Sequence, residues 1–311
     1  MGITVVGSVA FDSIETPAGK RERCLGGAAT HFSLAASFFT DVRVIAVVGE
    51  DFGPAEEQVF QARGIDTRGI ERAVGRSFFW EGSYLENLNE AKTHNTELNV
   101  FASFAPKIPE AYRDTEYLFL ANIDPVLQQR VREAMPQARM VAGDTMNYWI
   151  NDHRSALLKV MKGLDVLLIN DTETKMLAGD KNLVRAARAV LNMGPKSLVV
   201  KHGEYGATAF FSERSFAPHS KRAATPFRAP ALPLEEVVDP TGAGDSFAGG
   251  FYGYIASQAE LTPPVFCRAM FYGSVMGSFC VERFGTERAQ TLTRAEIDER
   301  FLLFRELTHL D

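Results

Sequence analysis

Short apolar runs rich in β-branched residues alternate along the chain with longer segments whose apolar residues recur at helical spacing. The runs at residues 3–7 and 42–48 predict two buried strands, and the segment at residues 27–39 predicts a helix between them. Four more buried strands are predicted later in the chain, at residues 117–121, 140–142, 166–169 and 198–201. Strands that alternate with helices in this way favour a parallel sheet covered by helices.

Six further segments have helical spacing, and they occupy residues 125–135, 153–162, 183–192, 243–257, 264–282 and 293–307. The last of them begins with a capping box, in which Thr293 is the N-cap and Glu296 stands three residues later. The sequence contains no internal repeat and no obvious linker between independent domains. We therefore predict one α/β domain over residues 1–311.

The segment at residues 76–104 departs from this alternation. Aromatic and polar residues alternate in it, at Phe78, Trp80, Tyr84, Asn99, Phe101 and Ser103. A period of two predicts exposed or half-buried strands rather than a helix. We expect a small antiparallel appendage here, to which residues 13–24 would contribute another part.

The composition narrows the class of protein. The hydrophobic share of 46% and the charged share of 23% are those of a soluble globular chain. A net charge of −6 and a pI near 5.6 give no support to a nucleic-acid partner. The first apolar run ends at Asp12, and no run approaches the roughly 20 apolar residues that span a membrane. Three cysteines without a CxxC pair favour a reducing compartment, so we expect a cytoplasmic protein.

The most specific motif is Asp-Pro-Thr-Gly-Ala-Gly-Asp-Ser-Phe-Ala-Gly-Gly at residues 239–250. Pro240 ends a strand because it cannot donate to the ladder. Gly242 and Gly244 let the backbone approach a ligand closely, and a helix starts at Ala243 between them. The unpaired N–H groups and the positive dipole end of that helix favour a bound anion.

Asp245 stands in the first turn of this helix, beside the expected anion site. Phosphoryl transfer requires that charge on the transferred group be neutralised and that the attacking hydroxyl be oriented. The Gly242–Gly244 turn suits the first task, and Asp245 suits the second as a general base. We therefore predict that residues 242–245 form the catalytic centre of a phosphotransferase.

The whole motif resembles the C-terminal signature of the ribokinase-like (PfkB) family of carbohydrate and nucleoside kinases, and the resemblance covers nearly the whole chain in the right order. It implies a three-layer α/β sandwich with a central, mostly parallel sheet and a small β-lid built from residues 13–24 and 76–104. It also implies an ATP- and Mg²⁺-dependent enzyme that phosphorylates a hydroxyl group of a small sugar-like molecule.

The resemblance assigns an acceptor site near the start of the chain. Asp12 matches the family's substrate-binding acid, and Gly26 and Gly27 match its paired glycines. These residues would hold substrate hydroxyl groups and let the backbone close on them. His31 stands where many members carry an Asn that binds sugar, so it is assigned to the same site. A histidine buried in the core remains an equal alternative for His31, and this departure puts the identity of the substrate in question.

A second group of positions resembles the family's nucleotide site, and it comprises Asn170, Lys201, Gly203, Gly206 and Thr241. Asn170 and Glu173 match the Asn-x-x-Glu motif, in which the Glu helps to hold hydrated Mg²⁺. They would equally suit a helix N-terminus. Lys201 could reach a phosphate or be a solvated strand end. Residues 144–149 resemble the acidic loop on the substrate side.

The resemblance leaves two features open. The loop at residues 283–286, with the backbone near Asp239 and Thr241, resembles one that holds a monovalent cation such as K⁺ in many relatives. The aromatic lid would cover the substrate and exclude water. Its exposed strand edges could also pair with those of a second subunit, which would make a homodimer.

Two alternatives to a sugar kinase remain. A nucleoside kinase of the same family would use the same chemistry at Asp245, and the aromatic lid and His31 keep this alternative open. A non-catalytic ligand sensor on the same fold is less favoured, because Asp245, Glu173 and the glycine turn are all present. A dinucleotide-dependent dehydrogenase is excluded, because the first strand is not followed by Gly-x-Gly-x-x-Gly.

Overall fold

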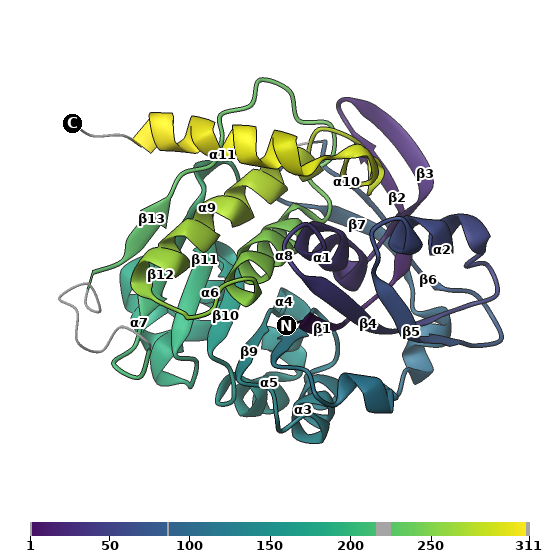
Figure 1. Ribbon diagram of the computed structural model, residues 1–311, viewed down its shortest axis with the longest axis horizontal. Helices are drawn as coiled ribbons and strands as arrows, with labels where there is room; N and C mark the ends of the chain where they lie inside the picture. Colours follow the sequence, from purple (N-terminus) through teal and green to yellow (C-terminus); the bar gives the residue numbers. More distant parts are fainter. Residues whose placement is uncertain (1, 86, 216–224, 309–311) are drawn as a thin grey trace.

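The computed structural model describes residues 2–85, 87–215 and 225–308, and within them the strands form two sheets (Figure 1). The large sheet has the strand order β13-β12-β11-β10-β9-β8-β1-β4-β5. Its strands are β1 (Gly2–Val6), β4 (Asp41–Val48), β5 (Asp66–Arg72), β8 (Tyr117–Leu120), β9 (Met140–Gly143), β10 (Val166–Asn170), β11 (Ser197–Lys201), β12 (Ala207–Phe211) and β13 (Phe227–Ala229).

The large sheet is parallel from β5 to β11, and β12 and β13 join it in antiparallel orientation. Every strand predicted for this sheet is present, which confirms the mostly parallel sheet. The strands at its two edges, which are β5, β12 and β13, were not among those predicted. β5 is only partly buried and carries Asp66 and Arg68, so its sequence lacks a continuous apolar run.

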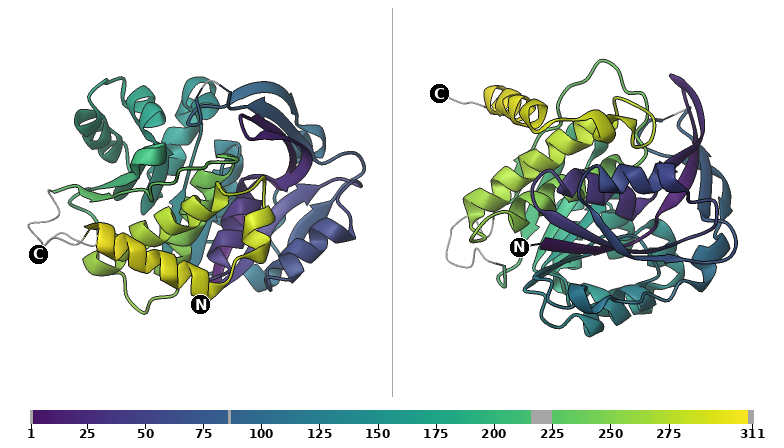
Figure 2. Two further views of the ribbon diagram at one scale, coloured as in Figure 1. Left: turned by 90° about the horizontal axis from the view of Figure 1, so that it is seen from above. Right: turned by 45° about the vertical axis from the view of Figure 1, so that its right-hand side comes forward.

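Helices cover both faces of the large sheet, so the fold is the expected three-layer α/β sandwich (Figure 2). One core contains side chains of α1 (Ala28–Ala36), α2 (Pro54–Gln61), α8 (Ala243–Ala256), α9 (Pro263–Cys280) and α11 (Arg294–Thr308). The other contains side chains of α3 (Pro125–Ala134), α4 (Asn147–Asp152), α5 (Arg154–Met161), α6 (Asp171–Ala178) and α7 (Leu183–Asn192).

The strands feed both cores because successive side chains point to opposite faces. In β8, Tyr117 and Phe119 enter the first core, and Leu118 and Leu120 enter the second. Such a strand is apolar at every position, which explains why these buried strands could be found in the sequence.

The small sheet lies at one side of the large one (Figure 1) and has the strand order β3-β2-β6-β7. Its strands are β2 (Ala10–Thr16), β3 (Gly19–Gly26), β6 (Phe78–Ser83) and β7 (Lys92–Glu97). We call this sheet the lid. The first apolar run of the chain is divided between the two sheets, since β1 ends at Val6 and β2 begins at Ala10. The pairing of two lids in a homodimer stays a prediction.

The prediction of a strand around Asn99, Phe101 and Ser103 is wrong. These residues form the 3₁₀ helix η1 (Asn99–Ser103). The ring of Phe101 stacks between Phe78 and Phe104, with centroid separations of 5.3 and 5.6 Å. The alternation of aromatic and polar residues arises here from a short turn whose aromatic face packs against the lid strand β6.

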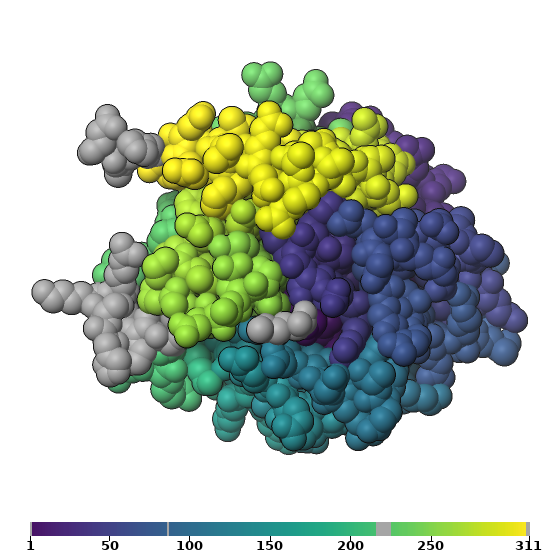
Figure 3. All heavy atoms as spheres, viewed as in Figure 1, coloured from purple at the N-terminus to yellow at the C-terminus, as the bar shows by residue number. Residues whose placement is uncertain are grey.

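The C-terminal helix α11 begins as the capping box predicts. The backbone N–H of Thr293 donates to the Glu296 carboxylate at 2.9 Å, and the Glu296 N–H donates to Oγ1 of Thr293 at 3.3 Å. Figure 3 shows α11 lying across one face of the molecule. None of the helices in the described ranges is both long and apolar enough to cross a membrane.

Candidate active site

Charged side chains from the carboxyl ends of three neighbouring strands meet the start of α8. Asp144 follows β9, Glu173 follows β10, and Lys201 ends β11. Burial raises the pKa of Asp144, the charge of Asp245 raises it further, and Lys201 opposes both effects. Glu173 acts on the same carboxyl group. These four side chains therefore form one electrostatic cluster at the carboxyl ends of the strands, which is where open α/β folds bind their ligands.

The turn before α8 is fixed by a carboxylate whose role the sequence analysis missed. Asp239 is fully buried, and it accepts hydrogen bonds from the backbone N–H groups of Thr241 and Gly285, both at 2.8 Å. Gly242 then takes a left-handed conformation, with φ of 75°, as the N-cap of α8. Asp239 thus joins this turn to the loop at residues 283–286, the pair of segments for which a K⁺ site is predicted.

Asp245 and Lys201 both lie at the glycine turn that begins α8. Asp245 lies in the first turn of the 14-residue helix α8, and burial raises the pKa of its carboxyl group while Lys201 lowers it. A Cβ atom on Gly244 would lie 2.8 Å from Nζ of Lys201. The Lys201 ammonium group therefore rests against the glycine turn, where it can attract an anion. Burial and this cation therefore act in opposite directions on the pKa of the Asp245 carboxyl group, and burial is the larger effect.

Asp12 lies in the lid strand β2 and faces the paired glycines. A Cβ atom on Gly26 would lie 1.9 Å from Oδ2 of Asp12, so a side chain at position 26 would displace the carboxylate. Gly27 has φ of 94°, and its Cβ atom would lie 2.5 Å from the carbonyl oxygen of Ser8. Gly27 cannot be replaced without moving the backbone, and Gly26 leaves the space in which the Asp12 carboxylate lies against the chain.

Burial raises the pKa of Asp12 from its ordinary value of 3.8 to about 7, and the charges of Asp239 and Asp245 add to the effect. Ionisation of Asp12 thus opposes folding. The wild-type protein has its full share of stability from this group below pH 3.8 and loses it as the pH rises through about 7. Substrate hydroxyl groups that donate to the carboxylate would favour its ionised form.

We therefore expect Asp12→Asn to stabilise the ligand-free protein at pH 8. The free energy of unfolding should rise by on the order of 3 kcal/mol at pH 8, and the gain should shrink toward pH 4. Denaturant unfolding at several pH values measures this difference. A variant less stable than the wild type at pH 8 would show that the carboxylate makes favourable contacts that outweigh its burial.

His31 lies beneath the glycine turn. Its side chain is buried, and a Cβ atom on Gly242 would lie 2.4 Å from the imidazole ring. Nδ1 lies 3.8 Å from Sγ of Cys280, and Nε2 has no hydrogen-bond partner among the described residues. Burial lowers the pKa of His31 to about 4, so the ring is neutral at physiological pH. His31 thus supports the turn from below, and its contact with substrate stays a prediction.

Asn170 and Glu173 form a reciprocal capping box at the start of α6. The Asn170 N–H donates to Oε2 of Glu173 at 2.8 Å, and the Glu173 N–H donates to Oδ1 of Asn170 at 2.7 Å. The helix-start role that the sequence left open is therefore present. This bond occupies Oε2 of Glu173, and Oδ1 of Asp144 is buried without a hydrogen-bond partner in the described ranges. Unsatisfied carboxylate oxygen of this kind suits a hydrated Mg²⁺ ion.

The described residues contain no group of three or more His, Cys, Asp or Glu side chains arranged to hold a metal ion. Magnesium commonly keeps several waters and binds through one or two carboxylates together with substrate phosphates. The sparse acidic set formed by Asp144 and Glu173 therefore fits a Mg²⁺ ion that arrives with a nucleotide.

The turn after β11 has no space for a side chain at either of its two glycines. Gly203 and Gly206 have φ of 56° and 91°. A Cβ atom on Gly203 would lie 1.8 Å from Oδ1 of Asn89, and one on Gly206 would lie 2.2 Å from the carbonyl oxygen of Ala229. Asn89 belongs to the connection between β6 and β7, so the lid reaches the predicted nucleotide turn. The sequence analysis gave no role to Asn89.

The lid also touches the glycine turn through Tyr84. Oγ1 of Thr241 donates to the Tyr84 hydroxyl group at 3.4 Å, and burial raises the pKa of that tyrosine to about 12. Other aromatics of the lid make different contacts, since Phe78 packs on Phe101 of η1 and Nε1 of Trp80 donates to Thr93 in β7. Tyr84 is therefore an aromatic residue by which the lid region contacts the predicted catalytic turn.

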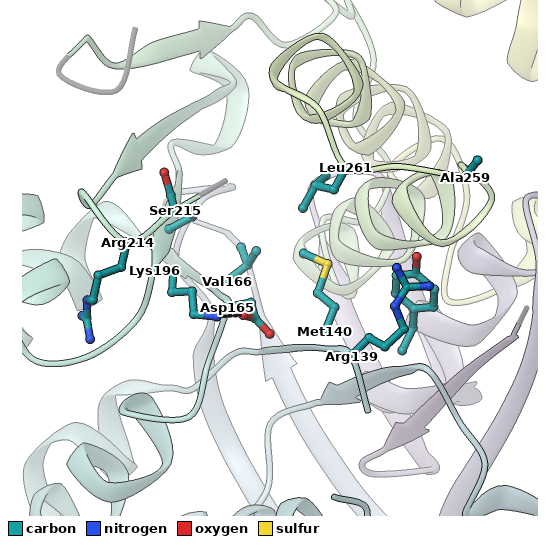
Figure 4. Close-up of a pocket in the computed structure, with 11 residues that line it drawn as sticks. Arg139, Met140, Asp165, Val166, Lys196, Arg214, Ser215, Ala259 and Leu261 are labelled. Carbon is teal, nitrogen blue, oxygen red and sulfur yellow. Dashed lines mark ion pairs between the residues drawn. The ribbon is translucent and has the colours of Figure 1, made fainter. Parts of the chain in front are cut away.

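A cavity of about 300 Å³ lies at the amino ends of the strands of the large sheet, opposite the ends that carry the site (Figure 4). It is lined by the amino ends of β9, β10 and β11, with Met140 and Val166 among its residues. Its cations are already engaged, since Lys196 pairs with Asp165 at 2.7 Å, Arg139 pairs with Glu116 at 3.6 Å, and Arg214 donates to the carbonyl oxygen of Gly194 at 2.8 Å. This cavity is separate from the site built by residues 239–245.

The chain is similar in sequence to known kinases. A cytidine kinase from Thermococcus kodakarensis is 28% identical over 258 residues, which cover 81% of this chain and 87% of the relative. A nucleoside kinase from Methanothermobacter thermautotrophicus is 25% identical and covers 92% of this chain and 91% of its own length.

Solved structures share the fold. Aminoimidazole riboside kinase from Salmonella enterica, in complex with aminoimidazole riboside and an ATP analogue, matches with a TM-score of 0.74 and 17% identity, over 97% of this chain and all of that one (100%). A putative ribokinase II from E. coli, in complex with ATP and Mg²⁺, matches with a TM-score of 0.75 and 19% identity, over 97% and 99% of the two chains. The model of the pfkB family carbohydrate kinases matches residues 3–292, and the chain therefore belongs to that family.

Proposed function

We propose that this kinase transfers the γ-phosphoryl group of ATP to a hydroxyl group on the sugar ring of a small molecule, with Asp245 as the general base. The observation that carries the proposal is the meeting of Asp245, Lys201 and the glycine turn at the start of α8. A cation, a helix N-terminus and a carboxylate in one place supply the two requirements of phosphoryl transfer, which are charge neutralisation and orientation of the nucleophile.

Each part of the site takes one task. The N–H groups of Gly242 and Gly244 would receive the phosphoryl oxygens, with the Lys201 ammonium group beside them, while the N–H of Ala243 holds the turn by donating to the carbonyl oxygen of Pro240 at 3.2 Å. Asp245 would take the proton from the acceptor hydroxyl as the new O–P bond forms, while the bond from the γ-phosphorus to the β,γ-bridging oxygen breaks and ADP leaves.

The acceptor would lie between the glycine turn and the lid. Asp12 would accept hydrogen bonds from its other hydroxyl groups, and Gly26 and Gly27 would leave it space. Tyr84 would close the lid over the reacting atoms and keep water out. The position of Tyr84 against Thr241 supports this role.

The nucleotide would lie over the ends of β10 and β11. Thr241, Asn170 and the Gly203–Gly206 turn would surround it, and Glu173 with Asp144 would hold hydrated Mg²⁺. The metal would neutralise charge on the phosphates. Activation by K⁺ at the loop tied to Asp239 stays part of the proposal.

We rank nucleosides ahead of free sugars as the acceptor. The sequence alone placed sugars first, with nucleosides as the alternative. Two relatives that span most of the chain are named for nucleoside phosphorylation, and so is the riboside kinase with the same fold. His31 in place of the family's sugar-binding Asn supports the same order. A free sugar remains the second candidate because the site elements that hold a ribose ring serve both.

A substrate panel tests both parts of the proposal. We expect purified protein with Mg²⁺ to consume ATP with one or a few nucleosides at turnover numbers in the range of about 1–100 s⁻¹, and much more slowly with free sugars and polyols. A strong response to a sugar alone would reverse the ranking. Silence across the panel, together with no thermal shift on adding ATP, would instead favour a ligand sensor and overturn the proposed activity.

A further inference from the structure

Two segments of the lid region, at Arg23 and at Ser77, are bonded to one carboxylate that lies outside the lid. Asp51 lies in the loop between β4 and α2. Its Oδ1 accepts hydrogen bonds from the backbone N–H of Ser77 at 2.8 Å and from the Ser77 hydroxyl at 2.7 Å. Its Oδ2 accepts one from Nη2 of Arg23 at 3.1 Å. Each oxygen therefore holds a different connection to the lid.

Ser77 marks the point where the chain enters the lid strand β6. It is buried, and its Oγ also accepts from the backbone N–H of Gly49 at 2.9 Å. A Cβ atom on Gly49 would lie 2.3 Å from the carbonyl oxygen of Gly75, so the two backbones are in direct contact. This connection is therefore packed against the end of β4, with Asp51 as its charged partner.

Arg23 marks the matching point in the lid strand β3. It has φ of 50°, which is uncommon for a residue with a side chain. Its guanidinium group lies 4.5 Å above the ring of Phe11, and its N–H donates to Oγ of Ser13 at 3.1 Å. Since strain of this kind persists only where the surroundings hold it, the bond to Asp51 helps to fix this turn of the strand.

The strand register connects these two points to the acceptor site. Asp12 in β2 stands opposite Cys24 in β3 and opposite Trp80 in β6. Cys24 directly follows Arg23, and β6 begins one residue after Ser77. Asp51 thus restrains both neighbours of the strand that carries Asp12.

We propose that Asp51 is a positioning residue that fixes the base of the lid and thereby places Asp12 for the acceptor. The inference rests on the proposed function for its kinetic consequence, but the restraint on the lid is a property of the fold alone. Asp51 itself touches neither the glycine turn nor the nucleotide turn in any contact described above, so its removal should act on the acceptor through the lid.

Hydrogen exchange tests the restraint without reference to activity. In Asp51→Ala we expect amides of β2 and β6 to exchange about tenfold faster, while amides of β8, β9 and β10 stay within about twofold of the wild type. Unchanged exchange in the lid of the folded variant would overturn the inference, whatever the enzyme phosphorylates.

Kinetics test the consequence for the site. With the acceptor found in the panel, Asp51→Ala should raise the KM for the acceptor about tenfold and leave the KM for ATP within about twofold. Asp51→Asn should give an intermediate value, because an amide oxygen can still accept from Ser77 while the ion pair with Arg23 is lost. Equal rises in both KM values would point to general damage and contradict the proposal.

Asp66→Asn is the matched control. The Asp66 carboxylate is similarly exposed, at 24% against 22% for Asp51, and it bonds to Arg68 and Tyr112 rather than to the lid. We expect neither a change in lid exchange nor a split between the two KM values. If Asp51→Ala does not fold, Arg23→Gln is the second variant. It removes the ion pair with Asp51 and leaves the bonds to Ser77, and the side chain that it changes is half-exposed. Hydrogen exchange in β2 and β3 should still be faster than in the wild type. Exchange at the wild-type rate in that variant would reject the proposal.

Failure of the proposed function looks different from failure of this inference. A wild-type protein that phosphorylates no acceptor would refute the kinase assignment and leave the exchange experiment to decide the role of Asp51. If the wild-type protein is an active kinase and Asp51→Ala changes neither the hydrogen exchange of the lid nor the KM for the acceptor, only the inference about Asp51 is refuted.

Discussion

Asp245→Asn should lower turnover by about 10²–10⁴-fold while the protein stays folded. The amide keeps the shape of the side chain but cannot take the proton from the acceptor hydroxyl. Loss of the negative charge also removes repulsion from Asp144, so stability should not fall. Steady-state ATP consumption with saturating acceptor measures the effect, and a thermal shift on adding ATP shows that the nucleotide site persists.

Asp298→Asn provides the control for this experiment. Asp298 pairs with Arg294 on the exposed surface of α11, and its replacement should change turnover by less than about twofold. Near-normal turnover in folded Asp245→Asn would remove Asp245 from the mechanism and return attention to Asp12 and Asp144 as the remaining carboxylates of the site.

Gly242→Ala should cost both activity and stability. The residue has φ of 75°, and its new methyl group would lie 2.4 Å from the ring of His31. The turn would have to move, and the N–H groups at the start of α8 would no longer point toward the position of the phosphoryl group. Loss of one such donor costs about 10²–10³-fold in turnover in comparable anion sites. Turnover and denaturant unfolding of the same preparation measure the two effects.

Gly179→Ala separates the backbone strain from the clash. Gly179 ends α6 with φ of 67°, and nothing lies within 4 Å of its would-be Cβ atom. Its replacement should cost about 1–2 kcal/mol of stability with little change in turnover. If Gly242→Ala behaved in the same way, the glycine turn would not be an anion site, and the phosphoryl group would need another set of donors.

The sequence was most informative where the physical signal is local. Buried parallel strands are apolar at every position, so the run at residues 166–169 could be recognised without its neighbours. Gly242 and Gly244 are required by backbone geometry and ligand approach, and their spacing from Asp245 is set by a single helix turn. The order of these motifs along the chain then placed them at one edge of one sheet.

Other features depend on contacts between distant segments, and no local pattern reveals them. Asp239 is the first residue of the motif in the sequence, but it joins the turn before α8 to a second loop because it accepts a hydrogen bond from the N–H of Gly285, 46 residues away. Gln128 donates from α3 to the carbonyl oxygens of Leu120, Ala121 and Asp144 and so fixes two strand ends. A glutamine within a helix carries no signal for such a role.

His31 and Lys201 show how the structure narrows choices that the sequence left open. For Lys201, contact with Gly244 favours the phosphate over bulk solvent. For His31, the buried core position and the neighbourhood of the site are both present, since the ring lies directly beneath the glycine turn. The choice between a sugar and a nucleoside depends on the free volume above these groups and on the lid, neither of which has a residue spacing that encodes it.

The division of the first apolar run between two sheets has a consequence for folding. β1 must pair with β4 and β8, β2 must pair with β6, and the hydroxyl group of Thr16 donates to the carbonyl oxygen of Val238, 222 residues further along. Contacts so distant in sequence form slowly because a long loop must close first. During synthesis β2 can pair with β3 and β6 early, but its bond to Val238 and the catalytic turn at residues 239–245 require the last third of the chain, so catalytic competence should appear as a late event rather than accumulate gradually.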